Sequence, residues 1–97
     1  MVDLRSLRYS ILAADYQSFR KAALAIGIRQ SALSRRIRSL EDTIGVSIFE
    51  RHSGGVRLTH AGVVFIKAVR GAVHGIDAAI STAGLAGGGQ IGRASAC

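Results

Sequence analysis

Length, composition and charge restrict this chain of 97 residues to a small set of functions. One domain with a small core fits this length, so a large substrate pocket is not expected. Thirteen Lys and Arg against six Asp and Glu give a formal net charge of +7, and most of the basic residues are arginine; this favours nucleic acid as a partner over a merely solvated basic surface.

The first two predicted elements are short helices joined by a tight turn. A first helix is predicted over about 4–15, with an inward face formed by residues at helical spacing: Leu4, Leu7, Ile11 and Ala14. Ser18 is a suitable N-cap for a second helix, and Gly27 ends it, because glycine tolerates the left-handed backbone of a helix end. The inward residues of that second helix are Phe19, Ala22, Ala23 and Ile26.

A third helix, over about 30–44, has two opposed faces. At about 100° per residue, one side is an apolar stripe of Leu33, Ile37, Leu40 and Ile44. The other side carries Ser31, Ser34, Arg35 and Arg38. Small hydroxyls and guanidinium groups suit a helix in the major groove of DNA, because large side chains at every position would hold it away from the bases. An ordinary amphipathic surface helix is the alternative.

A short hairpin is predicted over 46–58. Strand-favouring residues at Val46, Ile48 and Phe49 lead to a turn at 53–55. The return strand alternates, so that Val56 and Leu58 face the core while Arg57 points outward. With arginine on both arms, the hairpin is expected to act as a wing that reaches a neighbouring groove or the DNA backbone.

A long last helix is predicted from His60 to about Ala83, with Thr59 as its N-cap. Its apolar face recurs at steps of three and four, at Ala61, Phe65, Ala68, Ala72, Ile76 and Ala79. Such a helix spans about 36 Å, which exceeds the width of the small domain, so part of this face is expected to contact a second chain. Gly71 and Gly75 either permit close backbone approach there or leave a frayed helix. A glycine-rich tail is predicted from Gly84 onward.

Five motifs in register resemble the LysR-type transcriptional regulators, over residues 2 to about 85: Gln30-Ser31-Ala32-Leu33-Ser34-Arg35, Leu40-Glu41, Gly45-Val46, Phe49-Glu50-Arg51 and Leu58-Thr59-His60-Ala61-Gly62. The resemblance implies a mainly α fold. A three-helix winged helix-turn-helix with a two-stranded wing would occupy 1–59, and a linker and dimerisation helix would occupy 60–83. Residues 84–97 would then stand at the start of an effector domain, with Gln90-Ile91-Gly92 similar to its first strand.

The resemblance also implies a function, namely sequence-specific binding of double-stranded DNA by a bacterial, cytoplasmic, nucleoid-associated homodimer. The residues implied to read bases are Gln30, Ser31, Ser34 and Arg35. Those implied to hold the backbone or form the wing contact are Arg36, Arg38, Arg51, Gly54, Arg57 and Thr59. Those implied to form the dimer are Phe65, Ala68, Ala72, Gly75, Ile76 and Ala79. The family usually has proline where this chain has Ser31, which predicts different capping of the recognition helix.

Catalysis, a cofactor, a metal and a small-molecule effector site are not expected in this chain. His52, His60 and His74 are too widely separated for a metal site, and Cys97 lacks both a second cysteine and a neighbouring base. Charged residues interrupt the first apolar residues, so neither a signal peptide nor a membrane span is expected. Two other functions stay open: a dimerisation module that blocks a full-length regulator, and a non-specific basic protein that coats DNA.

Overall fold

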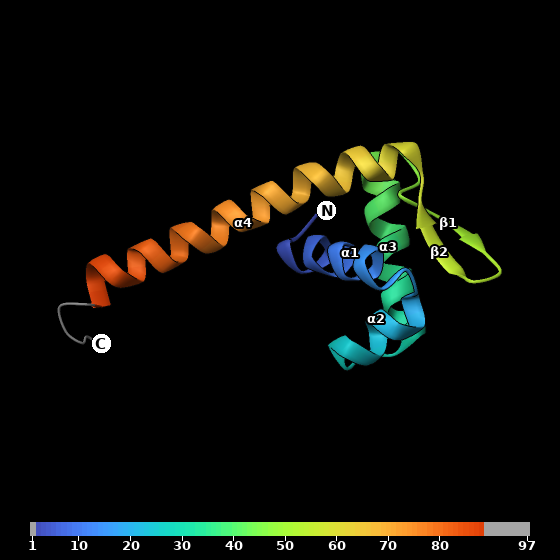
Figure 1. The fold of residues 1–97 in the computed structure, drawn as a ribbon, viewed down its shortest axis with the longest axis horizontal. Helices are drawn as coiled ribbons and strands as arrows, with labels where there is room; N and C mark the ends of the chain where they lie inside the picture. The colour runs from blue at the N-terminus through green and yellow to red at the C-terminus, as the bar shows by residue number, and fades with distance from the viewer. Residues whose placement is uncertain (1, 89–97) are drawn as a thin grey trace.

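The structure is a computed structural model that describes residues 2–88, which form helices and one two-stranded sheet (Figure 1). In chain order the elements are α1 (Leu4–Tyr16), α2 (Phe19–Ile26), α3 (Gln30–Ile44), β1 (Phe49–His52), β2 (Gly55–Leu58) and α4 (His60–Gly88). The two strands are antiparallel, with Phe49 opposite Leu58 and His52 opposite Gly55. The predicted winged helix-turn-helix followed by a long helix is therefore confirmed.

The ends of the first three helices follow local signals in the sequence. Gly27 and Gly45 adopt left-handed backbone, with φ of 87° and 82°, and close α2 and α3. At the start of α2, the Ser18 hydroxyl accepts a hydrogen bond from the Lys21 N–H at 3.1 Å. The predicted cap at Ser18 and the predicted stop at Gly27 are confirmed, and α3 ends near residue 44 as predicted. Gln17 ends α1 in the same left-handed region, with φ of 54°, without being glycine.

The core has two parts that meet at Phe49. The first part joins the three short helices to β2 and buries Ala13, Phe19, Ala22, Ala23, Leu33, Ile37 and Val56. The second part joins the end of α3 to the start of α4 and buries Leu40, Ile48 and Ile66. Phe49 packs against both parts. The predicted apolar stripe of α3 is confirmed, because three of its four residues are buried and Ile44 packs against the second part.

The buried side of α1 differs from the predicted one. Leu7 and Ala14 pack against the second part of the core as predicted, whereas Leu4 and Ile11 belong to neither part. The buried residues of α1 are Ser6, Ser10 and Ala13. The reason is that α1 contacts α2, α3 and α4 together, so it has a broad buried arc in place of one apolar stripe. Ser10 is fully buried without an unpaired hydroxyl, because it donates to the Leu7 carbonyl at 2.7 Å.

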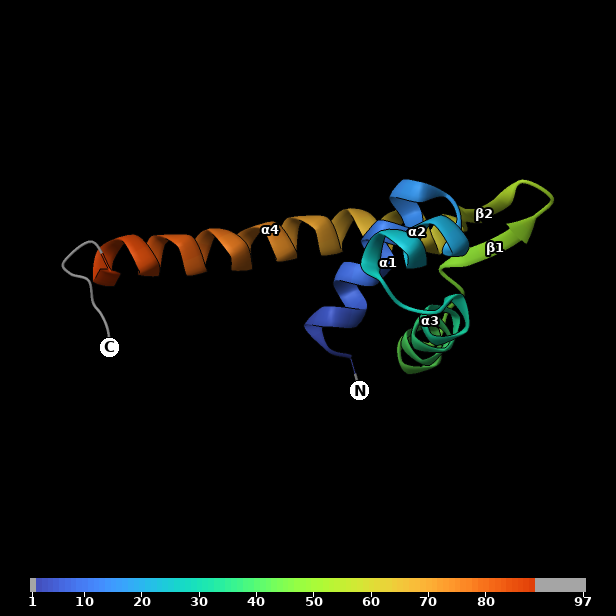
Figure 2. The ribbon, with the colours of Figure 1, turned by 90° about the horizontal axis from the view of Figure 1, so that it is seen from below.

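α4 runs past the domain and continues alone, while the wing projects at the opposite end of the molecule (Figures 1 and 2). The helix reaches Gly88, so the prediction of a tail from Gly84 is wrong for residues 84–88, which are helical. The chain contains no proline, and each glycine costs a helix only about 1 kcal/mol relative to alanine. The predictions for 89–97 lie outside the described residues. Within 2–88, no helix combines the length and apolarity that crossing a membrane requires.

Candidate nucleic-acid interface

α3 presents its predicted polar side to solvent. Gln30, Ser31, Arg35 and Arg38 are exposed, and Ser34 is half-buried. Buried leucine and isoleucine side chains support the same helix from behind, which holds this side in a fixed position. No side chain caps the helix at its N-cap residue Arg29, so the first-turn N–H groups keep the positive end of the helix dipole unneutralised.

A groove separates α3 from the wing and is lined by Phe19, Ser34, Ile37, Arg38, Glu41, Asp42, Gly45, Val46, Ser47, Phe49, Arg51 and Val56. Arg38 of α3 and Arg51 of β1 both line it, although they come from different elements. The structure therefore brings together two of the predicted backbone-contacting arginines. A phosphate chain between helix and wing would meet both guanidinium groups.

The position of Arg51 depends on the aromatic core beneath it. Its guanidinium carbon lies 5.2 Å from the centroid of the Phe19 ring, which is within the range of a cation–π contact. The Phe19 ring in turn meets the Phe49 ring edge to face, with centroids 5.4 Å apart. Phe19 is buried while Arg51 is exposed, so a core residue supports a charged group at the surface.

A second groove lies between the start of α2 and the wing, and several of its polar lining residues were not identified from the sequence. Arg20 and Lys21 line it together with His52, Gln30 and Arg51. Arg20 and Lys21 are both exposed. The sequence signal that could have identified this groove was the pair of basic residues, Arg20 and Lys21, in the first turn after the Ser18 cap. That turn comes close to the wing.

The loop before the wing is held by Glu41. Its Oε2 accepts the N–H of Ile48 at 2.7 Å and that of Phe49 at 3.2 Å. Two backbone donors on one carboxylate position the first wing strand relative to the end of α3. In the sequence, Glu41 stood out only as part of a family motif. Its role as a positioning residue depends on the loop folding back onto the helix.

Arg36 lies on another side of α3 and contacts α1. Its Nη1 donates to Asp3 Oδ2 and to Ser6 Oγ, each at 3.3 Å, and its guanidinium carbon lies 5.5 Å from the centroid of the Tyr9 ring. Hydrogen bonds from Ser6, first the backbone N–H and then the hydroxyl, lower the pKa of Asp3, and the charges of Arg36 and Arg5 add to the effect. The contact of Arg36 with the DNA backbone stays a prediction, and in this structure Arg36 Nη1 bonds within the protein.

Thr59 also has an internal role. Its hydroxyl donates to the Ser47 carbonyl at 2.6 Å and accepts the Gly62 N–H at 2.9 Å, which confirms the predicted cap of α4. The backbone N–H of Thr59 donates to the Ile48 carbonyl at 2.9 Å. These bonds join the loop before the wing to the start of α4. The contact of Thr59 with the DNA backbone stays a prediction.

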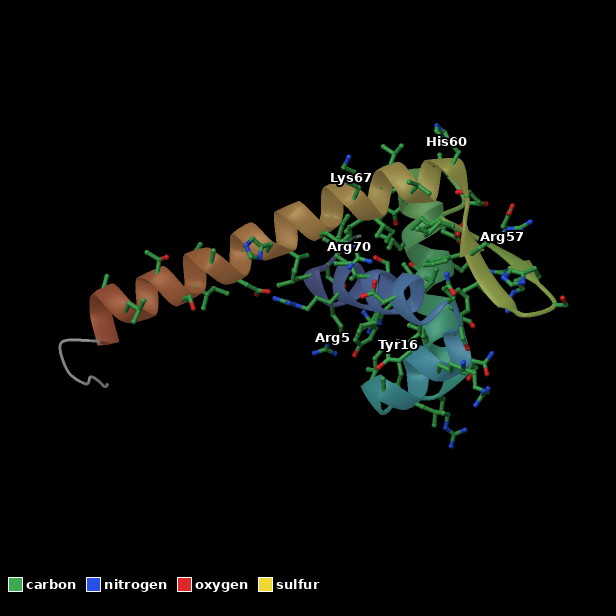
Figure 3. The ribbon with its side chains drawn as sticks, viewed as in Figure 1. Arg5, Tyr16, Arg57, His60, Lys67 and Arg70 are labelled. Atoms are coloured by element: carbon green, nitrogen blue, oxygen red, sulfur yellow. The ribbon has the colours of Figure 1, made fainter. Side chains whose placement is uncertain are left out.

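The wing itself is held on both sides. Arg57 Nε donates to Oε1 of Glu50, its cross-strand partner, at 2.6 Å, and Figure 3 shows Arg57 projecting away from the helices. Close to its turn, the Val56 N–H donates to the Gln17 carbonyl at 3.1 Å. Gly55 has a φ of 136°, and an added Cβ there would lie 2.4 Å from the Gln17 carbonyl oxygen, so this approach requires glycine. Gly54 is exposed at the turn.

α4 has one side against the domain and another that is exposed. Ile66, Val69 and Val73 are buried against the domain. Of the six predicted dimerisation residues, Phe65 is half-buried against the core, and the exposed ones are Ala68, Ala72, Gly75, Ile76 and Ala79. Figure 3 shows Lys67 and His60 on the side of α4 that points away from the domain. The sequence did not predict the exposed Val63, Val64, Ile80 and Leu85.

Residues 4–63 match the family described as "Bacterial regulatory helix-turn-helix protein, lysR family". The chain belongs to this LysR family. It is 44% identical over 64 residues to the HTH-type transcriptional regulator BudR of Klebsiella aerogenes, covering 66% of this chain and 45% of BudR. It is 35% identical over 92 residues to the regulator ClcR of Pseudomonas putida, covering 95% of this chain and 31% of ClcR. The chain thus spans less than half the length of either regulator.

Solved structures of LysR-family proteins have the same fold. The complex of the BenM DNA-binding domain with benA site 1 DNA superimposes with a TM-score of 0.82 at 36% identity, covering 90% of this chain and 99% of that one. The Vibrio fischeri DarR complex with DNA gives a TM-score of 0.79 at 36% identity, covering 84% of this chain and 28% of that one.

Within residues 2–88 of the present chain, no group of three or more His, Cys, Asp and Glu side chains could hold a metal ion.

Proposed function

We propose that this chain binds specific double-stranded DNA as part of a LysR-type transcription regulator that works as a homodimer in the bacterial cytoplasm. The observation that carries the proposal is the exposed polar side of α3, which stands beside Arg51 of the wing and is supported from behind by a buried apolar stripe. The solved DNA complexes of similar family members support it. A regulatory role, and not an enzymatic one, fits the relatives named above.

In this proposal the first turns of α3 read bases. Gln30, Ser31 and Arg35 are exposed, and Ser34 is half-buried beside them. Arginine can donate two parallel hydrogen bonds to guanine, and glutamine can pair with adenine in the same two-bonded way. The small serines let the helix backbone approach the floor of the major groove. Sequence preference then comes mainly from Gln30 and Arg35.

Phosphate contacts come from the groove between α3 and the wing. Arg38 and Arg51 line it, and Arg20 and Lys21 extend the basic surface along α2. Arg57 can reach a phosphate only by leaving Glu50, but such an exposed ion pair is worth at most about 1 kcal/mol and does not prevent this exchange. Gly54 allows the wing tip to approach DNA, without a basic side chain of its own.

The dimer forms through the exposed side of α4. A helix that leaves the domain with Ile76, Ile80 and Leu85 uncovered has apolar surface that a second copy would bury. Small residues at Ala68 and Ala72 allow two such helices to come close. Because regulators that dimerise bind two half-sites, the proposal predicts binding to a palindromic duplex.

The test is fluorescence anisotropy with labelled duplexes, one carrying a palindromic T-N11-A site and one scrambled, at two salt concentrations. Preference for the palindrome by about tenfold or more, equal to about 1.4 kcal/mol, supports specific readout. Arg35→Ala should lower affinity for the palindrome more than for the scrambled duplex, whereas Arg38→Ala should lower both alike. Arg5→Ala removes the same charge from an exposed position of α1 that lines neither groove, and it should change neither.

Equal and strongly salt-dependent binding to both duplexes would refute specific readout. It would leave a basic DNA-coating protein as the function. Failure to bind either duplex, with a dimer present by sedimentation, would favour the dimerisation module instead.

A further inference from the structure

Two forked ion pairs join α1 to α4, and their polarities are opposite. Arg8 of α1 donates from Nη2 and Nη1 to the Asp77 carboxylate of α4, at 2.6 and 3.1 Å. About two turns away along each helix, Arg70 of α4 donates from both terminal nitrogens to the Asp15 carboxylate of α1. The arginine lies on α1 in one pair and on α4 in the other, so the two pairs together require the antiparallel orientation of the helices.

The contact between these two pairs is apolar and does not select a register by itself. Val69 and Val73 are each 7% exposed where α4 packs against the domain, and Ile66 is buried beside them. Apolar burial is not directional, so this contact does not by itself fix the position of α4 along α1. The bonds of Thr59 hold the start of α4, and the charged pairs hold the part of α4 that packs on α1. The charged pairs at either end are directional, because each planar guanidinium matches a planar carboxylate.

Sliding by one turn, about 5.4 Å, would break the charge pattern in either direction. Moved one way, Arg8 would face His74 while Asp15 would face Lys67. Moved the other way, Arg8 would face Ser81 and Asp15 would face His74. In both cases Arg8 loses its carboxylate, and in neither case does a forked arginine–carboxylate pair form. The observed register is therefore the one in which both pairs are complete.

The register matters because the two helices belong to different parts of the molecule. α1 packs with α2 and α3 in the DNA-facing domain, whereas α4 carries the exposed side proposed for the dimer. The element with the most extensive contact to α4 is α1. Moving α4 along α1 would thus move each recognition helix relative to the second copy, and the distance between recognition helices determines the half-site spacing that a dimer accepts.

We propose that Arg8 with Asp77, and Arg70 with Asp15, form a register clamp that determines the half-site spacing read by the dimer. The inference rests on the proposed function, because it needs a dimer on two half-sites. The four residues are positioning residues: they act through the placement of α3 and not by touching DNA. Losing one of these partly exposed pairs should weaken the spacing preference without unfolding the domain.

The experiment is a charge exchange. Arg8→Asp, Asp77→Arg and the double variant are titrated against duplexes that keep both half-sites and change their separation by about one or two base pairs. Each single variant should lose about threefold of the preference for the best spacing, the size expected for one partly exposed pair, while affinity for a duplex with one half-site stays unchanged. The double variant re-forms the pair with reversed polarity and should recover the original preference.

Arg5→Asp is the matched control, because it makes the same charge change on an exposed position of α1 and should keep the spacing preference. Asp77→Asn removes the charge without reversing it and repeats the test with less risk to folding, which circular dichroism checks. If the single variants keep the original preference, or the double variant does not recover it, the clamp is wrong. If the unaltered chain shows no preference for two half-sites at all, the proposed function itself fails.

Discussion

Replacing Gly62 by alanine tests the joint between the winged helix-turn-helix domain and α4. An added Cβ would lie 2.0 Å from the Ile48 carbonyl oxygen and 2.9 Å from its carbon, so backbone must move. Ile48 is fully buried and its carbonyl accepts the Thr59 N–H, which leaves little freedom on that side. To relieve this clash, the start of α4 and the Ile48 carbonyl would have to move apart by about 1 Å. That movement would strain or break the bonds of the Thr59 hydroxyl that cap α4.

The free-energy change combines three terms. Overpacking costs about 1–3 kcal/mol and a lost helix cap costs about 1 kcal/mol, while alanine favours the helix over glycine by about 1 kcal/mol. We therefore expect a net loss of about 2 kcal/mol in the free energy of unfolding. For a chain of this size this lowers Tm by about 8–16 °C.

Thermal unfolding followed by circular dichroism measures this change. Gly84→Ala is the control, because the added Cβ would meet nothing within 4 Å on the same helix, and its Tm should stay the same or rise slightly. A Gly62→Ala protein whose Tm lies within about 2 °C of the original would refute the close approach of α4 to the Ile48 carbonyl.

Three further predictions concern charged residues. Glu41→Gln weakens an acceptor of two backbone N–H groups and should lower the free energy of unfolding by about 1–2 kcal/mol, with faster amide hydrogen exchange in the wing; unchanged exchange would contradict this. Arg36→Ala should lower Tm more than Arg38→Ala does, because Arg36 bonds to α1. Arg38→Ala should reduce the affinity for DNA, and the salt dependence of that affinity, more than Arg36→Ala does. A larger loss of affinity for Arg36→Ala in the anisotropy assay would show that Arg36 contacts DNA. Hydrogen bonds from Arg8 lower the pKa of Asp77 from its usual 3.8, so the stability it contributes is present above that pH and is lost as the pH falls through the lower value of the folded state. The stability curves of the original chain and Asp77→Asn should therefore converge in strong acid, and a constant difference across that range would argue against the ion pair.

Local signals determined most of the helix and strand positions. The Ser18 hydroxyl caps α2 and glycines end α2 and α3 because these interactions involve residues close together in the chain. The apolar stripe of α3 was also predictable, since periodicity alone places three of its residues on one buried face. The polar side opposite that stripe, which carries Arg35 and Arg38, followed from the same periodicity.

Only the tertiary structure decided which partner each polar group has. Arg36 and Arg38 are only two residues apart on α3, yet Arg36 bonds to α1 while Arg38 lines the groove beside the wing. The sequence predicted Thr59 as the cap of α4, and only the fold shows that its hydroxyl also bonds to the Ser47 carbonyl. Residue spacing describes one helix at a time and cannot identify what packs on it from a distant part of the chain.

The same limit explains the buried side of α1 and the role of its charges. One helix between several others buries an arc that no single stripe predicts, so serines are buried where leucines were expected. The pairing of Arg8 with Asp77 links residues 69 positions apart, and nothing near either residue in the sequence indicates the other. The sequence by itself determined the elements and the charge of this protein, whereas their packing decided which charges hold the domain together and which remain free for DNA, because pairing depends on distances that only the folded chain establishes.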